Sequence, residues 1–103
     1  MSLLYHLILR DEWDGAADPY VPTGFDDLGF VHLSRSEQVD IPGRALFAGR
    51  DDVLLLVLDP ARLDDVRFED GVPPTPGVLF PHLYGPLPHV AVMDVLPYRA
   101  PGS

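Results

Sequence analysis

The run VLLLVL at residues 53–58 consists of six consecutive apolar side chains near the middle of the chain. An uninterrupted apolar run of this length predicts a strand that is buried on both faces. Residues 3–9, LLYHLIL, form a second run of the same kind, with His6 among its apolar side chains. Two strands of this type predict a fold that is organised around the interior of a sheet.

Outside these runs, 12 prolines and nine glycines interrupt the chain, so the remaining elements are predicted to be short. Residues 18–27 and 70–77 contain closely spaced Pro and Gly residues and are predicted to be loops. Residues 59–63 predict a single capped turn. Further strands are predicted over residues 29–34, 66–69, 79–85 and 90–96.

A capping box marks one helix start, because Ser34 can serve as the N-cap and Glu37 follows three residues later. This motif predicts a helix from residue 35. Pro42-Gly43 is expected to stop or kink that helix, since Pro lacks the backbone N–H that a helix interior uses. Another short helix is predicted over residues 10–17.

The chain length of 103 residues suits a single domain, which we place at residues 1–99 with a frayed tail over residues 100–103. Strands outnumber helices in this prediction. The expected fold class is therefore α+β, with a small mixed or antiparallel sheet and one or two short helices. No apolar run approaches the length of a membrane span and no basic leader is present, so we expect a cytoplasmic protein.

The charged residues exclude several classes of activity. Sixteen acidic residues against seven basic ones give a formal net charge of −9, which disfavours duplex DNA as a partner. The chain has no Lys, which excludes a Schiff base and a P-loop, and no Cys, which excludes thiolate catalysis and disulfides. The net charge also favours a monomer or a weak dimer.

Two predicted strands carry an aromatic residue, a histidine and a hydroxyl at every second position: Phe30-x-His32-x-Ser34 and Phe80-x-His82-x-Tyr84. In a strand these three side chains share one face, and the opposite face, with Val31, Leu33 and Leu83, suits the core. The first strand adds His6. We therefore predict that His6, His32 and His82 lie on different strands of one sheet and line a cleft for a small ligand.

Several of these residues also have a purely structural explanation. His6 can be a core histidine with a satisfied hydrogen bond. Ser34 is first of all a helix cap, and Tyr84 can be packing with a tethered hydroxyl. Glu69, at the end of a predicted strand, is either a functional acid or a solvated strand end.

Residues 29–50 are the segment without net negative charge. The segment contains only two acidic residues but three arginines, Arg35, Arg44 and Arg50. We therefore expect an anionic group of a ligand, such as a phosphate, to bind this segment.

The motifs in combination resemble a known family. They are YH in the first strand, GFVHLS at residues 29–34, FAGRDDVLLLVLD at 47–59, VRFE at 66–69 and FPHLYGPL at 80–87. Over residues 3–97 the chain is similar to the domain-of-unknown-function family 952. The resemblance implies a fold similar to the ADP-ribosyltransferase superfamily, in which a split sheet holds NAD in its cleft.

That superfamily uses a His or Arg on its first strand, a Tyr, Ser or His on a following strand, and often a Glu on a later one. The resemblance implies that His6 takes the first role. The stretch from His32 to Ser34 is similar to one in RNA 2′-phosphotransferases, and Glu69 or the strand of His82 and Tyr84 takes the third role. The implied catalytic residues are His6, His32, His82 and Glu69, and the implied cofactor-binding residues are Ser34, Arg35, Arg44, Arg50 and Tyr84.

Three functions follow from these patterns. The first is binding of NAD or an ADP-ribose-like nucleotide, with transfer of a glycosyl or phosphoryl group through an oxocarbenium-like state that a carboxylate stabilises. The second is a non-catalytic ligand-binding or interaction module on the same fold. The third is a metal enzyme that uses the three histidines. We expect no metal, because no two of these histidines have the short spacing of a ligand motif.

Overall fold

In the computed structural model, which describes residues 2–102, the strands form two antiparallel sheets of three strands each. β3 (Val53–Leu58) is the central strand of the first sheet and lies between β1 (Leu4–Leu9) and β6 (Val92–Tyr98). Val53 and Leu56 point to opposite faces of β3 and are 1% and 0% exposed. The prediction of a strand buried on both faces at residues 53–58 is therefore confirmed.

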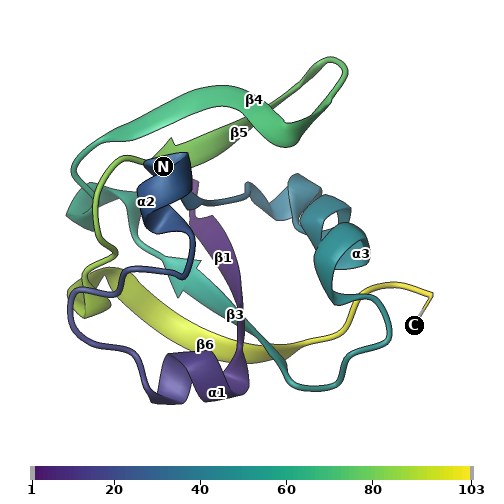
Figure 1. Ribbon diagram of the computed structural model, residues 1–103, viewed down its shortest axis with the longest axis horizontal. Coiled ribbons are helices and arrows are strands. Elements are labelled where there is room, and N and C mark those ends of the chain that lie inside the picture. Colours follow the sequence, from purple (N-terminus) through teal and green to yellow (C-terminus); the bar gives the residue numbers. More distant parts are fainter. Residues whose placement is uncertain (1, 103) are drawn as a thin grey trace.

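The second sheet has the strand order β2 (Val31–His32), β5 (Val78–Leu83) and β4 (Val66–Thr75). Within residues 2–102 one backbone bridge joins the two sheets, between Tyr5 and Ser34, with N···O distances of 2.9 and 2.8 Å. In Figure 1, β4 and β5 arch over the top of the molecule while β1, β3 and β6 cross below them. The α+β class with a split antiparallel sheet is confirmed.

Residues 70–75 belong to β4 and not to the loop that was predicted over residues 70–77. β4 is an edge strand of its sheet, and Pro residues are tolerated on an edge because one side of that strand needs no hydrogen-bond donors. The turn to β5 is confined to residues 76–77. Gly77 has a φ of 76° there, a conformation that favours glycine.

The core lies between the two sheets. Its apolar side chains come from β1 and β3 on one side and from β2 and β5 on the other: Leu4, Ile8, Leu54, Leu56 and Leu58, against Val31, Leu33 and Leu83. Ala100 is also buried, so burial extends one residue past the predicted domain boundary at residue 99.

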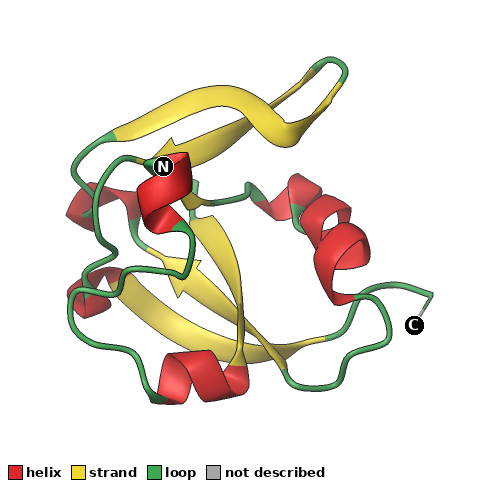
Figure 2. Cartoon of the chain, viewed as in Figure 1, coloured by secondary structure: helices red, strands yellow, loops and turns green. Residues whose placement is uncertain are grey.

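The helices are short and lie around the sheets (Figure 2). α1 (Arg10–Asp14) is shorter than the predicted helix over residues 10–17, and α2 (Phe25–Leu28) overlaps the end of the loop that was predicted over residues 18–27. The described residues also form three 3-10 turns: Ser36–Gln38, Pro60–Arg62 and His89–Ala91. The predicted capped turn is confirmed, since Asp59 accepts from the Ala61 N–H. No helix in the described chain is long and apolar enough to cross a membrane.

α3 (Asp40–Phe47) corrects the prediction made from the capping box. Ser34 is occupied in the bridge to Tyr5 and makes no helix cap; instead Gln38 accepts a hydrogen bond from the Arg35 backbone N–H over 3.0 Å. Pro42-Gly43 does not stop the helix, which runs from Asp40 to Phe47. Pro42 lies in the first turn, where a backbone N–H has no partner within the helix, so its missing donor costs little.

Candidate functional site

The outer face of the second sheet carries the polar and aromatic side chains that the period-two pattern predicted. His32 pairs with His82 across β2 and β5, and Arg67 pairs with His82 across β5 and β4, so these side chains share one face. Val31, Leu33 and Leu83 point to the other face and are at most 2% exposed. The predicted separation of a face with His32 and His82 from a core face is confirmed for this sheet.

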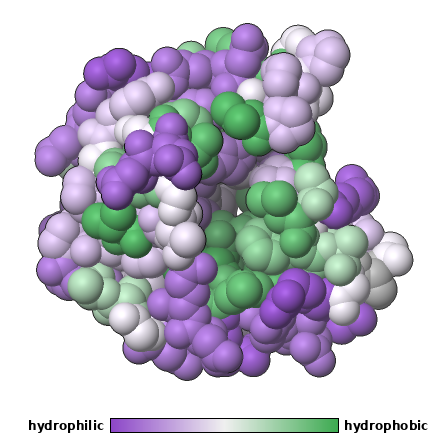
Figure 3. Space-filling view, in the orientation of Figure 1, coloured by the Kyte–Doolittle hydropathy of each residue, from purple (hydrophilic) through white to green (hydrophobic). Residues whose placement is uncertain are grey.

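A cavity of about 380 Å³ lies on this outer face, between the β4–β5 hairpin and α3. Phe30, His32 and Phe80 contribute the wall on the sheet side. The opposite walls are mostly apolar and include Ile41, Pro42, Ala45 and Leu46 from α3, and Gly71, Val72, Pro73 and Pro74 from β4. Figure 3 shows hydrophobic residues gathered around a hollow near the middle of the molecule.

His32 is the one titratable side chain among the residues that line the cavity. Its ring centroid lies 5.1 Å from that of Phe80 and 5.5 Å from that of His82. Burial, followed by the neighbouring His82 and His6, lowers the pKa of His32 to about 4. The imidazole is therefore neutral near pH 7, and it can donate or accept one hydrogen bond with a ligand.

His82 lies behind Phe30, beneath the cavity wall. Its ring stacks on that of Phe30 with centroids 3.8 Å apart, and the residue is 1% exposed. Nδ1 donates to Oε1 of Glu69 over 3.1 Å. This bond leaves Nε2 as the free ring nitrogen, and Nε2 has no hydrogen-bond partner within residues 2–102.

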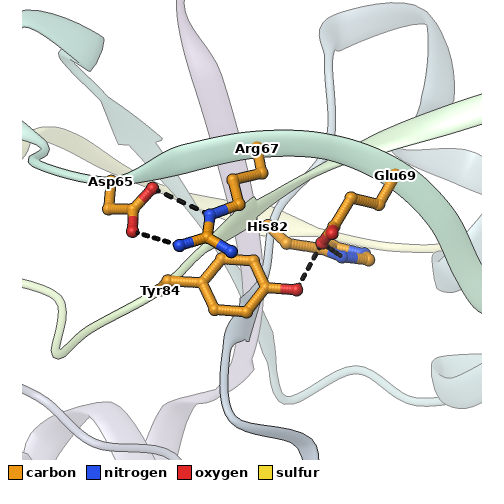
Figure 4. Close-up of polar contacts among 5 residues, drawn as sticks. All are labelled: Asp65, Arg67, Glu69, His82 and Tyr84. Atoms are coloured by element: carbon orange, nitrogen blue, oxygen red, sulfur yellow. Dashed lines mark hydrogen bonds and ion pairs between the residues drawn. The ribbon is translucent and has the colours of Figure 1, made fainter.

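Glu69 is held by two donors on one oxygen atom (Figure 4). The Tyr84 hydroxyl and His82 Nδ1 both donate to Oε1, and within the described chain Oε2 accepts no hydrogen bond. The Tyr84 hydroxyl, and secondly His82, lower the pKa of Glu69, while the Glu69 carboxylate raises the pKa of Tyr84. Glu69 is therefore an oriented, ionised carboxylate with one free oxygen, and its side chain is 39% exposed.

Arg67 belongs to the same cluster and was missed by the sequence analysis. Its guanidinium carbon lies 4.2 Å from the centroid of the Tyr84 ring, and it makes a two-point contact with Asp65 at 3.1 and 2.9 Å (Figure 4). The sequence does contain a signal for it. Asp65, Arg67 and Glu69 occupy every second position, so a strand over these residues places all three on one face.

His6 does not line the cavity, and the prediction that it shares one sheet with the other histidines is wrong. It lies on β1 of the first sheet, where alternation gives it the same inward face as Leu4 and Ile8. Its Nδ1 donates to the backbone carbonyl of His32 over 2.7 Å. Burial lowers the pKa of His6, so the neutral ring acts as a hydrogen-bonded link between the two sheets.

The segment over residues 29–50 does not form one anion site around its arginines. Arg35 pairs with Glu37 over 3.3 Å, and Arg50 makes two short contacts with Asp52 at 2.8 and 2.7 Å. Arg44 is exposed on α3 and belongs to the helix that lines the cavity. Ser34 is 4% exposed and engaged in the bridge to Tyr5, so it is not available to a ligand.

The described residues hold no group of three or more His, Asp or Glu side chains arranged to bind a metal ion. His6 and His82 also lie on different sheets. The geometry does not support the third hypothesis, a metal enzyme built from three histidines.

Comparison with known proteins identifies the family. Residues 7–95 match the family described as "Protein of unknown function (DUF952)". The chain belongs to this family. The match confirms the resemblance drawn from the motifs, whereas the similarity of DUF952 to ADP-ribosyltransferases remains a hypothesis.

Solved structures of protein CC0527 from Caulobacter crescentus are similar to this DUF952 chain. One crystal structure has a TM-score of 0.80 at 30% identity, covering 93% of this chain and 85% of that one. A crystal structure of a double mutant gives 0.81 at 29% identity, with the same coverage. A solution NMR structure gives 0.74 at 28% identity, covering 96% and 86%. No curated protein matches the chain.

Proposed function

We propose that this DUF952 protein binds a small nucleotide-like ligand, such as NAD or ADP-ribose, with a flat ring of the ligand in the cavity beside His32. The observation that carries the proposal is the cavity of about 380 Å³ with Phe30, Phe80 and a neutral His32 in its wall. This volume lies within the range of small-ligand pockets, which combine apolar walls with a few polar groups. We expect a cytoplasmic monomer or weak dimer without duplex DNA as a partner.

The chemistry of the cavity wall favours the ring end of such a ligand. Phe30 and Phe80 are 8% and 2% exposed, so they contribute apolar ring atoms to the wall, and His32 offers one hydrogen bond that fixes the orientation of the ligand ring. No charged residue lines the cavity, so the phosphates of a nucleotide would lie outside it. Arg44 on α3 and Arg67 on β4 are the arginines on the two elements that flank it.

Ligand titration tests this proposal. NAD, ADP-ribose and 2′-phosphorylated RNA are titrated into the full chain by calorimetry and by NMR. Ala45→Phe places a ring inside the cavity and should abolish binding, because Ala45 lines it. Ala48→Phe is the matched control, since Ala48 is exposed on the same helix end without lining the cavity. A parent protein that binds none of the three ligands, or equal binding by both variants, would refute the proposal.

A second candidate function is transfer of a glycosyl or phosphoryl group, and the geometry of Glu69 favours it. Two donors on Oε1 hold the carboxylate in place while Oε2 is free, on a residue that pairs with Phe80 of the cavity wall. Such a carboxylate can stabilise the positive charge that develops when a glycosidic bond breaks. His82 would act as a positioning residue for Glu69.

Turnover separates this candidate from a non-catalytic module. Nicotinamide release from NAD is followed in the parent and in Glu69→Gln. Transfer chemistry predicts release by the parent, and at least a hundredfold loss in the variant with ligand affinity kept. Binding of NAD without release of nicotinamide by the parent would favour the non-catalytic ligand-binding or interaction module. The exposed apolar side chains of Leu28, Leu46 and Val72 around the cavity also suit such a module.

A further inference from the structure

A groove separate from the cavity lies beside the start of β1, between the Pro60–Arg62 turn and β4. Its volume is about 470 Å³. Leu4, Leu63, Val66 and Phe68 form apolar walls, and Arg35 and Asp64 are its charged residues. Val66 and Phe68 alternate along β4 with Arg67 and Glu69, so this groove opens on the opposite face of the sheet from the cavity.

Phe68 gives the groove an aromatic wall that is open to a ligand. It is 50% exposed although it is a large apolar side chain on a strand. The guanidinium carbon of Arg35 lies 6.0 Å from the centroid of the Phe68 ring. A cation at this distance from a ring face is attracted to it, so Arg35 is held beside the apolar surface of the groove.

Arg35 retains unused hydrogen-bonding capacity in this position. Its Nε lies 3.3 Å from Oε2 of Glu37, yet the nitrogen is buried and makes no hydrogen bond within residues 2–102. The side chains of Arg35 and Glu37 are 42% and 64% exposed, and a surface ion pair of this kind is weak. A ligand carboxylate can therefore replace Glu37, because a planar guanidinium binds a carboxylate through two parallel hydrogen bonds.

We infer that this groove binds a small aromatic carboxylate. The ring of the ligand packs against Phe68, Leu63 and Val66, and its carboxylate binds the Arg35 guanidinium. Asp64 in the same groove disfavours a second negative charge, so a monoanion fits better than a phosphate ester. The site lies apart from the cavity beside His32 and does not depend on the nucleotide proposal.

Phenylacetate tests the inference against its uncharged analogue, phenylacetamide, on the full chain by amide NMR titration. The acid should shift the amide resonances of Arg35 and Phe68 and bind about tenfold more tightly than the amide, as expected for one charge-assisted contact. Arg35→Gln should remove this preference, and Arg35→Lys should restore part of it. Arg50→Gln is the matched control, because Arg50 pairs with Asp52 away from the groove and should leave the preference unchanged.

Several results would overturn the inference. One is equal affinity of the parent for phenylacetate and phenylacetamide. Another is an unchanged preference for the acid in an Arg35→Gln variant whose amide spectrum is native. A third is the absence of amide resonance shifts at millimolar phenylacetate. Shifts confined to residues of the cavity, or displacement of the acid by NAD, would show that no separate groove is used. Phe68→Ala should weaken the acid and the amide alike, since both pack the same ring against Phe68.

Discussion

The hydroxyl of Tyr98 donates a hydrogen bond to Oδ1 of Asp40 over 2.7 Å, and so joins the last strand to the helix that walls the cavity. Burial, followed by the Asp40 carboxylate, raises the pKa of Tyr98 to about 12. The hydroxyl therefore remains a donor throughout the physiological pH range. The position of α3, and with it one wall of the cavity, depends on β6.

Gly43→Ala is expected to destabilise the protein by about 1–3 kcal/mol, which is typical of overpacking. A Cβ at Gly43 would lie 2.7 Å from Cζ of Tyr98, so the ring or α3 must move. This cost opposes the gain of roughly 1 kcal/mol that Gly to Ala gives inside a helix. Urea denaturation measures the difference. Gly15→Ala is the control, because its Cβ would meet its nearest neighbour at 3.6 Å; equal effects of both changes would contradict the packing of Tyr98 on α3.

Stability is expected to fall as the pH drops from 7 toward 4. The pKa of His32 is about 4 in the folded protein, against 6.5 for the unperturbed group, so between these values the unfolded chain binds more protons. At about 1.4 kcal/mol per pKa unit the loss is on the order of 3 kcal/mol, and His6 adds to it with the same sign. The free energy of unfolding of His32→Gln should depend less on pH over this range. Identical pH dependence in parent and variant would count against a buried, neutral His32.

Tyr84→Phe should raise the pKa of Glu69 toward its usual value, because the Tyr84 hydroxyl is the main cause of the lowered pKa. Carboxyl-carbon NMR, recorded as a function of pH, measures this change directly. Tyr5→Phe provides the control, since Tyr5 lies on β1 of the other sheet. A Glu69 that titrates alike in both variants would mean that the tyrosine does not hold the carboxylate in solution.

His82→Ala is expected to lower stability more than His32→Ala. His82 is 1% exposed and stacks on Phe30, so its removal leaves a void of the kind that costs about 2–5 kcal/mol in protein cores. The ring of His32 borders an open cavity, where surrounding solvent can replace it. Thermal melting of both variants measures the order. A larger loss of melting temperature in His32→Ala than in His82→Ala would mean that His32 is the more tightly packed of the two histidines.

The sequence predicted those parts of the fold that depend on local side-chain pattern. The run at residues 53–58 became the strand with the same bounds, and the period-two pattern placed His32 and His82 on one face with Val31 and Leu83 on the other. These predictions succeed because alternation along a strand is a local property.

The remaining features depend on which strands become neighbours, and local pattern does not contain that information. His6 belongs to a different sheet because β1 pairs with β3, and it reaches His32 only through a backbone carbonyl. Pro73 and Pro74 suggested a loop, although an edge strand tolerates them. Ser34 matched a capping box, but its backbone pairs with Tyr5 of β1 and it does not cap a helix.

The outer part of the β4–β5 hairpin has no third strand beside it, because β2 pairs with β5 only at Val31 and His32. That free part supplies the cavity wall from Gly71 to Thr75. A change in hairpin length at residues 76–77 would therefore alter the depth of the cavity while the core between the sheets stays intact. Hairpins of different length in related chains would therefore give cavities of different depth on an unchanged scaffold, and grafting hairpins between such chains would transfer that depth.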